Sequence, residues 1–233
     1  MGFDIVPTEQ VWWYLFTLFT AAGLVIAGGV TLFFIYTLFK YRSTDGGEGV
    51  KAAREGRMLV ETTPRGITKV ILLATGIVVF TLIVTTIDDT IYLEFTPTED
   101  AFPVWVIGFQ FGWRFEYEVN GETVSTVGYV VLPSDTVVEF KVTSIDVFHT
   151  FGAREFKNKI DALPGILNSM WVKTPPEPTV FKAYCYELCG VGHSFMVADI
   201  IIVDKEQFFE AYNAGPEEFQ RFLEEVAAEY REG

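Results

Sequence analysis

The stretch QVWWYLFTLFTAAGLVIAGGVTLFFIYTLF, from Gln10 to Phe39, contains no charged residue over its thirty positions. An α-helix rises about 1.5 Å per residue, so this stretch is long enough to cross a hydrocarbon core of about 30 Å. Trp12 and Trp13 lie near one end and Tyr36 near the other, as expected at membrane–water interfaces. The stretch therefore predicts a first transmembrane helix over about 10–39.

A second uncharged run covers residues 70–87. Its eighteen residues are close to the lower limit for a membrane span, so we expect this helix to extend over about 68–90. A cleavable signal peptide and a buried soluble helix hairpin are the alternatives for the first run. The flank with Asp4 and Glu9 but no Lys or Arg disfavours the signal peptide, and thirty uncharged residues disfavour the hairpin.

The segment between the two runs carries seven basic residues against four acidic ones. Cytoplasmic loops of membrane proteins have an excess of Lys and Arg, whereas Asp and Glu contribute little to orientation. The sequence therefore predicts a multi-pass protein of the cell membrane with this loop in the cytoplasm and with both termini outside. The basic residues are Lys40, Arg42, Lys51, Arg54, Arg57, Arg65 and Lys69.

Charge and apolarity are segregated along the chain of 233 residues. Half of the residues are hydrophobic, yet the formal net charge is −14, from 17 Lys and Arg against 31 Asp and Glu. This acidic balance disfavours nucleic acid as a partner, because phosphate binding needs clustered Lys and Arg. Two cysteines and two histidines are too few for a disulfide scaffold but enough for one metal site.

The chain after the second apolar run is rich in β-branched and aromatic residues, with turn residues in between. Asn120-Gly121 is a hairpin signal, and Pro133 opens a turn. Several strands in just over a hundred residues predict an antiparallel sandwich of Greek-key type. The strand-like runs are 102–119, 123–132, 136–145, 179–188 and 195–203.

Two short helices are expected at the C-terminal end. Asp204 suits the N-cap of a helix from Lys205 to about Asn213, and Pro216 followed by acidic residues suits the start of a final helix. The predicted fold is therefore two N-terminal transmembrane helices, an all-β sandwich and short C-terminal helices. The expected divisions are a membrane anchor over 1–94, the sandwich over 95–203 and acidic helices over 204–233.

The residues suited to metal chemistry are concentrated in YCYELCGVGHSFM, 184–196. The other histidine, His149, follows one of the strand-like runs. A distant histidine joined to a Cys–His–Met loop at the end of a sandwich is typical of blue-copper sites, which use two imidazoles, a thiolate and a weak axial thioether. The spacing C-x-E-x-C-x3-H-x2-M comprises Cys185, Glu187, Cys189, His193 and Met196.

The second cysteine is one thiolate more than a single copper ion needs, and three interpretations compete for it. A disulfide is compatible with an oxidising exterior but leaves the adjacent His and Met without a role. Zinc accepts two Cys and two His, but the thioether favours copper. In the third interpretation, both thiolates bridge two copper ions, each copper takes one histidine, and Met196 and a backbone carbonyl bind weakly. Ligand softness and spacing favour this one.

With these residues the chain resembles subunit II of the haem-copper terminal oxidases, of the cytochrome c oxidase type, over nearly its whole length. The resemblance covers two membrane helices, a cupredoxin domain, the motif of the dinuclear CuA centre, and the segments 108–117 and 146–165. It implies a magnesium ion bound by the Glu187 side chain at the interface with subunit I. The copper ligands that it implies are His149, Cys185, the Glu187 carbonyl, Cys189, His193 and Met196.

Two further roles follow from the resemblance. The family has a Trp directly after the Gln of its aromatic segment, where electrons are accepted; here that position is Phe111, and Trp113 lies two residues later. Both are candidates for that role, although alternation equally assigns Trp113 to the core face of a strand. Glu61 resembles the family's carboxylate for proton uptake at the cytoplasmic side, or is a solvated loop residue.

The resemblance implies a function in electron transfer. The chain would accept electrons from an external donor, either a cytochrome c or a small copper protein, and pass them to haem in subunit I. The complex would reduce dioxygen to water and move protons across the membrane, with haem in the partner subunit only and no complete active site in this chain. Other oxidase subunits and membrane lipid are further expected partners. The alternatives are the CuA subunit of a nitric oxide reductase and a free-standing membrane-anchored copper electron carrier.

Overall fold

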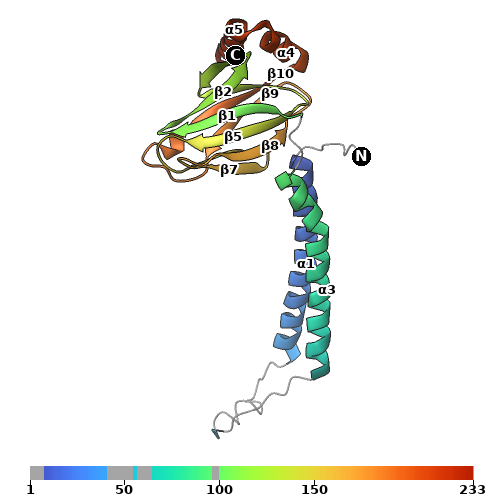
Figure 1. Ribbon diagram of the computed structural model, residues 1–233. Coiled ribbons are helices and arrows are strands. Elements are labelled where there is room, and N and C mark those ends of the chain that lie inside the picture. The colour runs from blue at the N-terminus through green and yellow to red at the C-terminus, as the bar shows by residue number, and fades with distance from the viewer. Residues whose placement is uncertain (1–7, 41–54, 57–64, 96–99, 233) are drawn as a thin grey trace. The chain divides into compact units, whose positions relative to one another are not determined.

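The computed structural model describes residues 8–40, 55–56, 65–95 and 100–232. In this part of the chain, two long N-terminal helices are followed by two five-stranded sheets and two C-terminal helices (Figure 1). The chain divides into a helical unit and a sandwich unit. The predicted fold class is confirmed.

The helical unit, Tyr14–Asp89, contains most of α1 (Thr8–Lys40) and most of α3 (Arg65–Phe95). Both are long and apolar enough to cross a membrane. Large apolar side chains are exposed along both helices, among them Leu24 and Phe80, which water would not tolerate but lipid does. In α3 the hydroxyl of Thr81 donates to the carbonyl of Ile77 at 2.9 Å, so its polar group is satisfied within the helix.

The sandwich has two sheets, with strand orders β3-β2-β1-β5-β8 and β4-β10-β9-β6-β7. The first sheet contains β1 (Phe102–Phe109), β2 (Gly112–Val119), β3 (Glu122–Val127), β5 (Val137–Ser144) and β8 (Asn168–Lys173). The second contains β4 (Tyr129–Pro133), β6 (His149–Ala153), β7 (Asn158–Ala162), β9 (Thr179–Cys185) and β10 (Val197–Val203).

The expectation of a purely antiparallel sandwich is wrong. β1 pairs with β5 in parallel, and β4 pairs with β10 in parallel, while the other strand pairs are antiparallel. Parallel strands need a long crossover connection rather than a tight turn. The connections between these parallel strands pass through the other sheet. Because each sheet contains one parallel pair among antiparallel pairs, both sheets are mixed.

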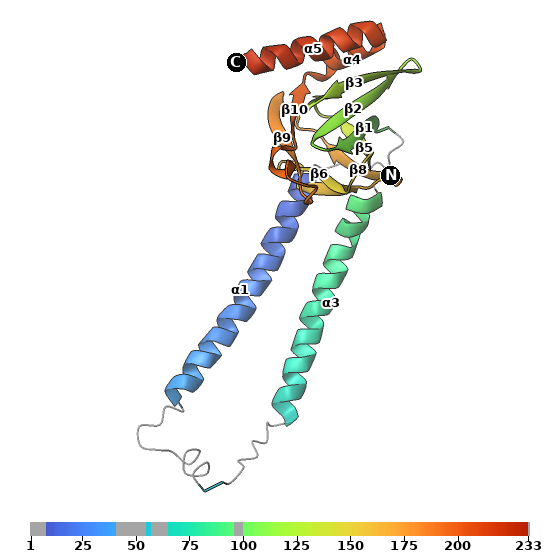
Figure 2. The same ribbon diagram turned by 90° about the vertical axis from the view of Figure 1, so that its left-hand side faces the viewer.

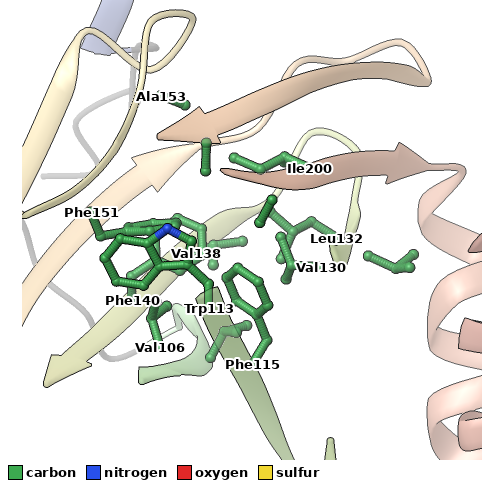
Figure 3. Close-up of a cluster of buried hydrophobic side chains, with 14 of the residues drawn as sticks. Val106, Trp113, Phe115, Val130, Leu132, Val138, Phe140, Phe151, Ala153 and Ile200 are labelled. Carbon is green, nitrogen blue, oxygen red and sulfur yellow. The ribbon is translucent and has the colours of Figure 1, made fainter. Parts of the chain in front are cut away.

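The core lies between the two sheets, and Figure 3 shows its centre. Side chains alternate along the strands, so Trp113 and Phe115 of β2 point inward together. Phe151 of the second sheet packs edge to face against Trp113 and Phe140, with ring centroids 5.2 and 5.3 Å apart. The aromatic core therefore lies next to the start of β6, where His149 is located.

The C-terminal helices α4 (Lys205–Ala214) and α5 (Pro216–Glu232) lie together at one end of the sandwich, near β3 and β4 (Figure 2). As predicted, Asp204 caps α4, because its carboxylate accepts from the backbone N–H groups of Glu206 and Gln207. Phe208 of α4 and Phe219 of α5 are buried against each other, with ring centroids 5.3 Å apart. The helices therefore close this end of the core.

Tyr117 joins the two sheets and the C-terminal helices. Its hydroxyl donates to the carbonyl of Val131 and accepts from the Val131 N–H, both at 3.0 Å. Its ring packs edge to face on Phe219, 5.2 Å between centroids. Burial raises the pKa of Tyr117 far above its usual value near 10.

Candidate metal centre

The predicted ligands converge at the end of the sandwich opposite the C-terminal helices. His149 is the first residue of β6, and Cys185 is the last residue of β9. The chain then turns through Cys189 into the short 3-10 helix η1 (His193–Phe195), and Met196 leads into β10. The backbone N–H of Cys185 donates to the carbonyl of Met196 at 3.1 Å, which closes this loop at its base. We call residues 186–196 the ligand loop.

The donor atoms of these side chains lie close together. The Cys185 and Cys189 sulfurs are 3.9 Å apart. Nδ1 of His149 lies 3.9 Å from the Cys185 sulfur, and Nδ1 of His193 lies 3.7 Å from the Cys189 sulfur. The Met196 sulfur is 3.7 Å from the Cys189 sulfur. Each thiol therefore has one imidazole beside it.

The separations suit metal binding. Two atoms that are each about 2.0–2.3 Å from one metal ion at a near-tetrahedral angle lie roughly 3.5 Å apart. The sulfur–nitrogen separations of 3.9 and 3.7 Å are close to that value. The separation of the two sulfurs is far longer than the S–S length of about 2.05 Å in a disulfide bond, and both cysteines are free thiols. The disulfide interpretation is therefore not supported.

The donor set is buried and soft. His149 and Met196 are fully buried, Cys185 and Cys189 are nearly so, and His193 is half-buried. Burial raises the pKa of the Cys189 thiol to about 11, and the adjacent Cys185 adds to this rise. Two thiols, two imidazoles and a thioether fit copper, because thioether is a copper ligand. Without a cation, two neighbouring buried thiolates would repel each other.

Glu187 contributes differently from the other predicted ligands. Its carbonyl oxygen lies 3.1 Å from the Cys185 sulfur, at the edge of the donor set. Its side chain is exposed. The structure therefore brings the carbonyl to the centre, and the magnesium role of the side chain stays a prediction.

Asp146 anchors His149, a role that sequence reasoning did not assign to it. Oδ1 of Asp146 accepts from Nε2 of His149 at 2.9 Å, which directs Nδ1 toward the thiol of Cys185. The same carboxylate accepts from the backbone N–H groups of Val147 and Gln110, both at 2.6 Å. Burial opposes its ionisation, but these hydrogen bonds outweigh burial and lower the pKa of Asp146.

The hairpin between β1 and β2 packs against the ligand loop. The side-chain amide of Gln110 donates to the carbonyl of Cys189 at 2.6 Å. The ring of Phe111 occupies the space beside two glycines, because a Cβ on Gly192 would lie 2.4 Å from that ring and a Cβ on Gly190 would lie 3.1 Å from it. Gly190 also has a φ of 133°, which side chains rarely tolerate. Both glycines are needed for this close approach.

The two candidate residues for electron acceptance differ in position. Phe111 is partly exposed and lies against the ligand loop, whereas Trp113 is fully buried. The Trp113 ring packs edge to face on His149, with centroids 5.9 Å apart. Gly108 makes room for this contact, since a Cβ there would lie 3.0 Å from the His149 ring and 3.1 Å from Trp113. Glu61 lies outside the described residues.

The fold and the donor set together define a membrane-anchored copper protein of cupredoxin type. The family model for the periplasmic domain of cytochrome c oxidase subunit II matches residues 118–204. The chain is 59% identical to haem-copper oxidase subunit 2 of Aeropyrum pernix, over 98% of this chain and 100% of that protein. It is 36% identical to cytochrome c oxidase subunit 2 of Alkalihalophilus pseudofirmus, over 52% of this chain and 31% of that protein.

A solved structure of the periplasmic domain of subunit II of the Bradyrhizobium japonicum cytochrome oxidase is 28% identical, with a TM-score of 0.48. The match covers 54% of this chain and 99% of the chain in that structure. The full-length likeness to the Aeropyrum pernix protein establishes the family. This chain belongs to the family of haem-copper oxidase subunit 2.

Proposed function

We propose that the chain accepts electrons from an external donor at a dinuclear copper centre and passes them toward haem in subunit I of an oxidase complex. The observation that carries this proposal is the pairing of each thiol with one imidazole, Cys185 with His149 and Cys189 with His193. Copper bound there would supply one-electron redox chemistry. We propose the Glu187 carbonyl, 3.1 Å from the Cys185 sulfur, and the Met196 sulfur, 3.7 Å from the Cys189 sulfur, as the weak ligands.

The surrounding residues favour fast electron transfer because they rigidly hold the atoms that would bind copper. The His149 ring is fixed by Asp146, Trp113 and Gly108, and the carbonyl of Cys189 is fixed by Gln110. A rigid, buried donor set limits both geometric change and water access when the charge of the centre changes. We propose Phe111 as the surface residue through which electrons arrive, and Trp113 as a packing residue behind His149.

The wider setting of the chain is also part of the proposal. A basic loop between two apolar helices supports a cytoplasmic loop with the sandwich outside the membrane. We propose subunit I and other oxidase subunits as partners, Glu187 as a magnesium ligand at that interface, and Glu61 as a proton-uptake residue. The Aeropyrum pernix relative is named a haem-copper oxidase subunit, which favours dioxygen over nitric oxide as the final acceptor and a complex over a free carrier.

Metal analysis of the purified full-length protein tests the copper centre. We expect two copper ions per chain and a paramagnetic resonance spectrum in which one unpaired electron is shared equally by two copper nuclei. Cys185→Ser and Cys189→Ser should each abolish that spectrum, because each removes one of the two thiolates that the ions would share. Cys is absent elsewhere in the chain, so the two variants test the whole thiolate set.

A colourless protein that takes up zinc in preference to copper would overturn the proposal. So would one copper ion per chain with a spectrum that persists in Cys189→Ser.

A further inference from the structure

A hollow of about 390 Å³ lies beside the turn that joins β6 to β7. The turn is closed by a hydrogen bond from the Lys157 N–H to the Arg154 carbonyl at 3.3 Å. The volume of the hollow falls within the range of about 300–1,000 Å³ that is usual for small-molecule sites. Three basic and two aromatic side chains are among those that line it: Arg154, Lys157, Lys159, Trp12 and Tyr186. We call this space the cationic hollow.

Aromatic rings hold two of the three cations in place. The Lys157 ammonium lies 5.2 Å from the centre of the Trp12 ring and 5.7 Å from the centre of the Trp13 ring. The Lys159 ammonium lies 5.7 Å from the centre of the Tyr186 ring. A cation–π contact attracts an ammonium group through the quadrupole of a neutral ring, so it does not neutralise the charge. The cationic hollow therefore keeps a net positive charge.

The three cations lack carboxylate partners. In the part of the chain that the structure describes, none of Arg154, Lys157 and Lys159 forms an ion pair. Glu155, on the same turn, lines a separate hollow together with Lys173. By contrast, five other basic residues each lie within 4.0 Å of a carboxylate: Arg114, Lys141, Lys173, Lys182 and Arg221. In a chain with a net charge of −14, three adjacent unpaired cations indicate a site for an anion.

The cationic hollow adjoins the start of a candidate membrane span. Trp12 and Trp13 lie where α1 enters its long apolar stretch, and tryptophan at such a position lies at the level of the lipid headgroups. Val11 is buried, and all three residues belong to the sandwich unit. Because Lys157 contacts both tryptophan rings, we expect the cations to lie at headgroup level as well.

We propose that the cationic hollow binds the phosphate group of an anionic membrane lipid. Arg154 and Lys157 would donate to the phosphate oxygens, since guanidinium and ammonium groups are the usual protein partners of phosphate. Each cation near an anionic lipid surface strengthens binding by about fivefold. The bound headgroup would fix this face of the sandwich at the membrane surface. The inference involves no proposed copper ligand and is independent of the proposed function.

Native mass spectrometry of the purified full-length chain in detergent tests the site, with phosphatidylglycerol titrated as the probe. Arg154→Gln/Lys157→Gln should weaken binding of this lipid at least about tenfold, because it removes two cations. Lys157→Arg keeps the charge and should bind as wild type does. Lys141→Gln/Lys182→Gln is the matched control: it removes two cations that pair with carboxylates elsewhere on the sandwich, and it should change the affinity less than about twofold.

Two further probes separate a lipid headgroup from other anions. Phosphatidylcholine carries the same phosphate diester without a net charge, and it should bind at least about tenfold more weakly than phosphatidylglycerol. Inorganic phosphate in millimolar excess should leave phosphatidylglycerol bound, because it lacks the acyl chains that hold the lipid beside the apolar start of α1.

Three results would overturn the inference. The first is equal affinity for phosphatidylglycerol in Arg154→Gln/Lys157→Gln and in the matched control. The second is displacement of the lipid by millimolar inorganic phosphate, which would assign the cationic hollow to a soluble anion. The third is loss of subunit I from an oxidase complex purified with the Arg154→Gln/Lys157→Gln chain, which would assign these cations to a subunit interface.

Discussion

Asp146 connects three parts of the metal centre through one side chain. Its carboxylate holds the His149 ring, the backbone that leads to His149, and the tip of the β1–β2 hairpin at Gln110. A sequence pattern gives no reason to separate this carboxylate from other surface acids. Its role depends on the hairpin tip, which is 36 residues away in the chain and reaches Asp146 only in the folded sandwich.

Asp146→Ala should lower copper affinity by about 10–100-fold, the usual cost of removing a hydrogen-bond partner from a metal-ligating histidine. Asp146→Asn should have a smaller effect, because one amide oxygen can still accept from His149. Affinity is measured by competition with a chelator of known copper affinity. Asp135→Ala is the control, since it removes a carboxylate that pairs with Lys173. Equal affinities for Asp146→Ala and Asp135→Ala would contradict the anchoring role.

The ligands themselves could be predicted from the sequence, but the residues that pack against them could not. Cys, His and Met at metal-binding spacing are chemically distinctive, whereas Gly192 is one of 20 glycines. The need for glycine there arises from the Phe111 ring, which lies in the space that a Cβ would occupy. The burial of Trp113 likewise follows from the inward alternation of β2, which the sequence offered only as one of two interpretations.

At the scale of elements, the hairpin tip at Gln110-Phe111 was missed. The run 102–119 was expected as a single strand-like stretch, but it forms β1 and β2 on either side of these two residues. Asn-Gly is a strong hairpin signal because both residues accept positive φ, and Gln-Phe carries no such signal. Contacts of Gln110 with Cys189 and of Phe111 with the loop glycines hold the tip instead.

Other strands were missed or joined for related reasons. The run 123–132 divides at Gly128, whose φ of 78° turns the chain from β3 in one sheet to β4 in the other. β6, β7 and β8 lie in segments with interspersed Gly, Asn, Asp and Lys, where strand propensity is low. Pairing with neighbouring strands outweighs that propensity. The capped C-terminal helices were predicted well, because caps are local signals.

Tyr117 makes the sandwich sensitive to alkali. Its folded pKa is raised above the unfolded value near 10, so its stabilising contribution is fully present below that pH and is lost as the pH rises above it. We expect the free energy of unfolding to fall by up to about 1.4 kcal/mol per pH unit above pH 10. Denaturant unfolding between about pH 8 and 11, followed by tryptophan fluorescence, measures this slope.

Tyr117→Phe should make the alkaline slope shallower, although it costs about 1–3 kcal/mol at neutral pH because the N–H and carbonyl of Val131 lose their partner. Tyr230→Phe, at an exposed position on α5, is the matched control and should retain the wild-type slope. An unchanged slope in Tyr117→Phe would show that Tyr117 does not contribute to it.

At the scale of the whole molecule, the distribution of basic residues predicts which side of the membrane each part occupies. The same epitope can be inserted between Gly46 and Gly47, which lie outside the described residues, and after Gly233. In intact cells only the C-terminal epitope should bind antibody, because the seven basic residues retain the loop in the cytoplasm. Permeabilised cells should show both.

Antibody binding to the loop epitope in intact cells would contradict this orientation. It would also place the sandwich on the side opposite to the one proposed for the donor.

The parallel strand pairs have a consequence for the order in which the protein matures. β4 is joined on one side by β10, which follows it only after five other strands, and β10 also pairs with β9. Contacts between such distant segments form slowly, because long loops must close before any pairing is gained. Met196 and Cys185 come together only when β10 takes its place beside β9. We therefore expect the donor set to be assembled late in folding, so that copper is delivered to a nearly finished domain after its chain has crossed the membrane.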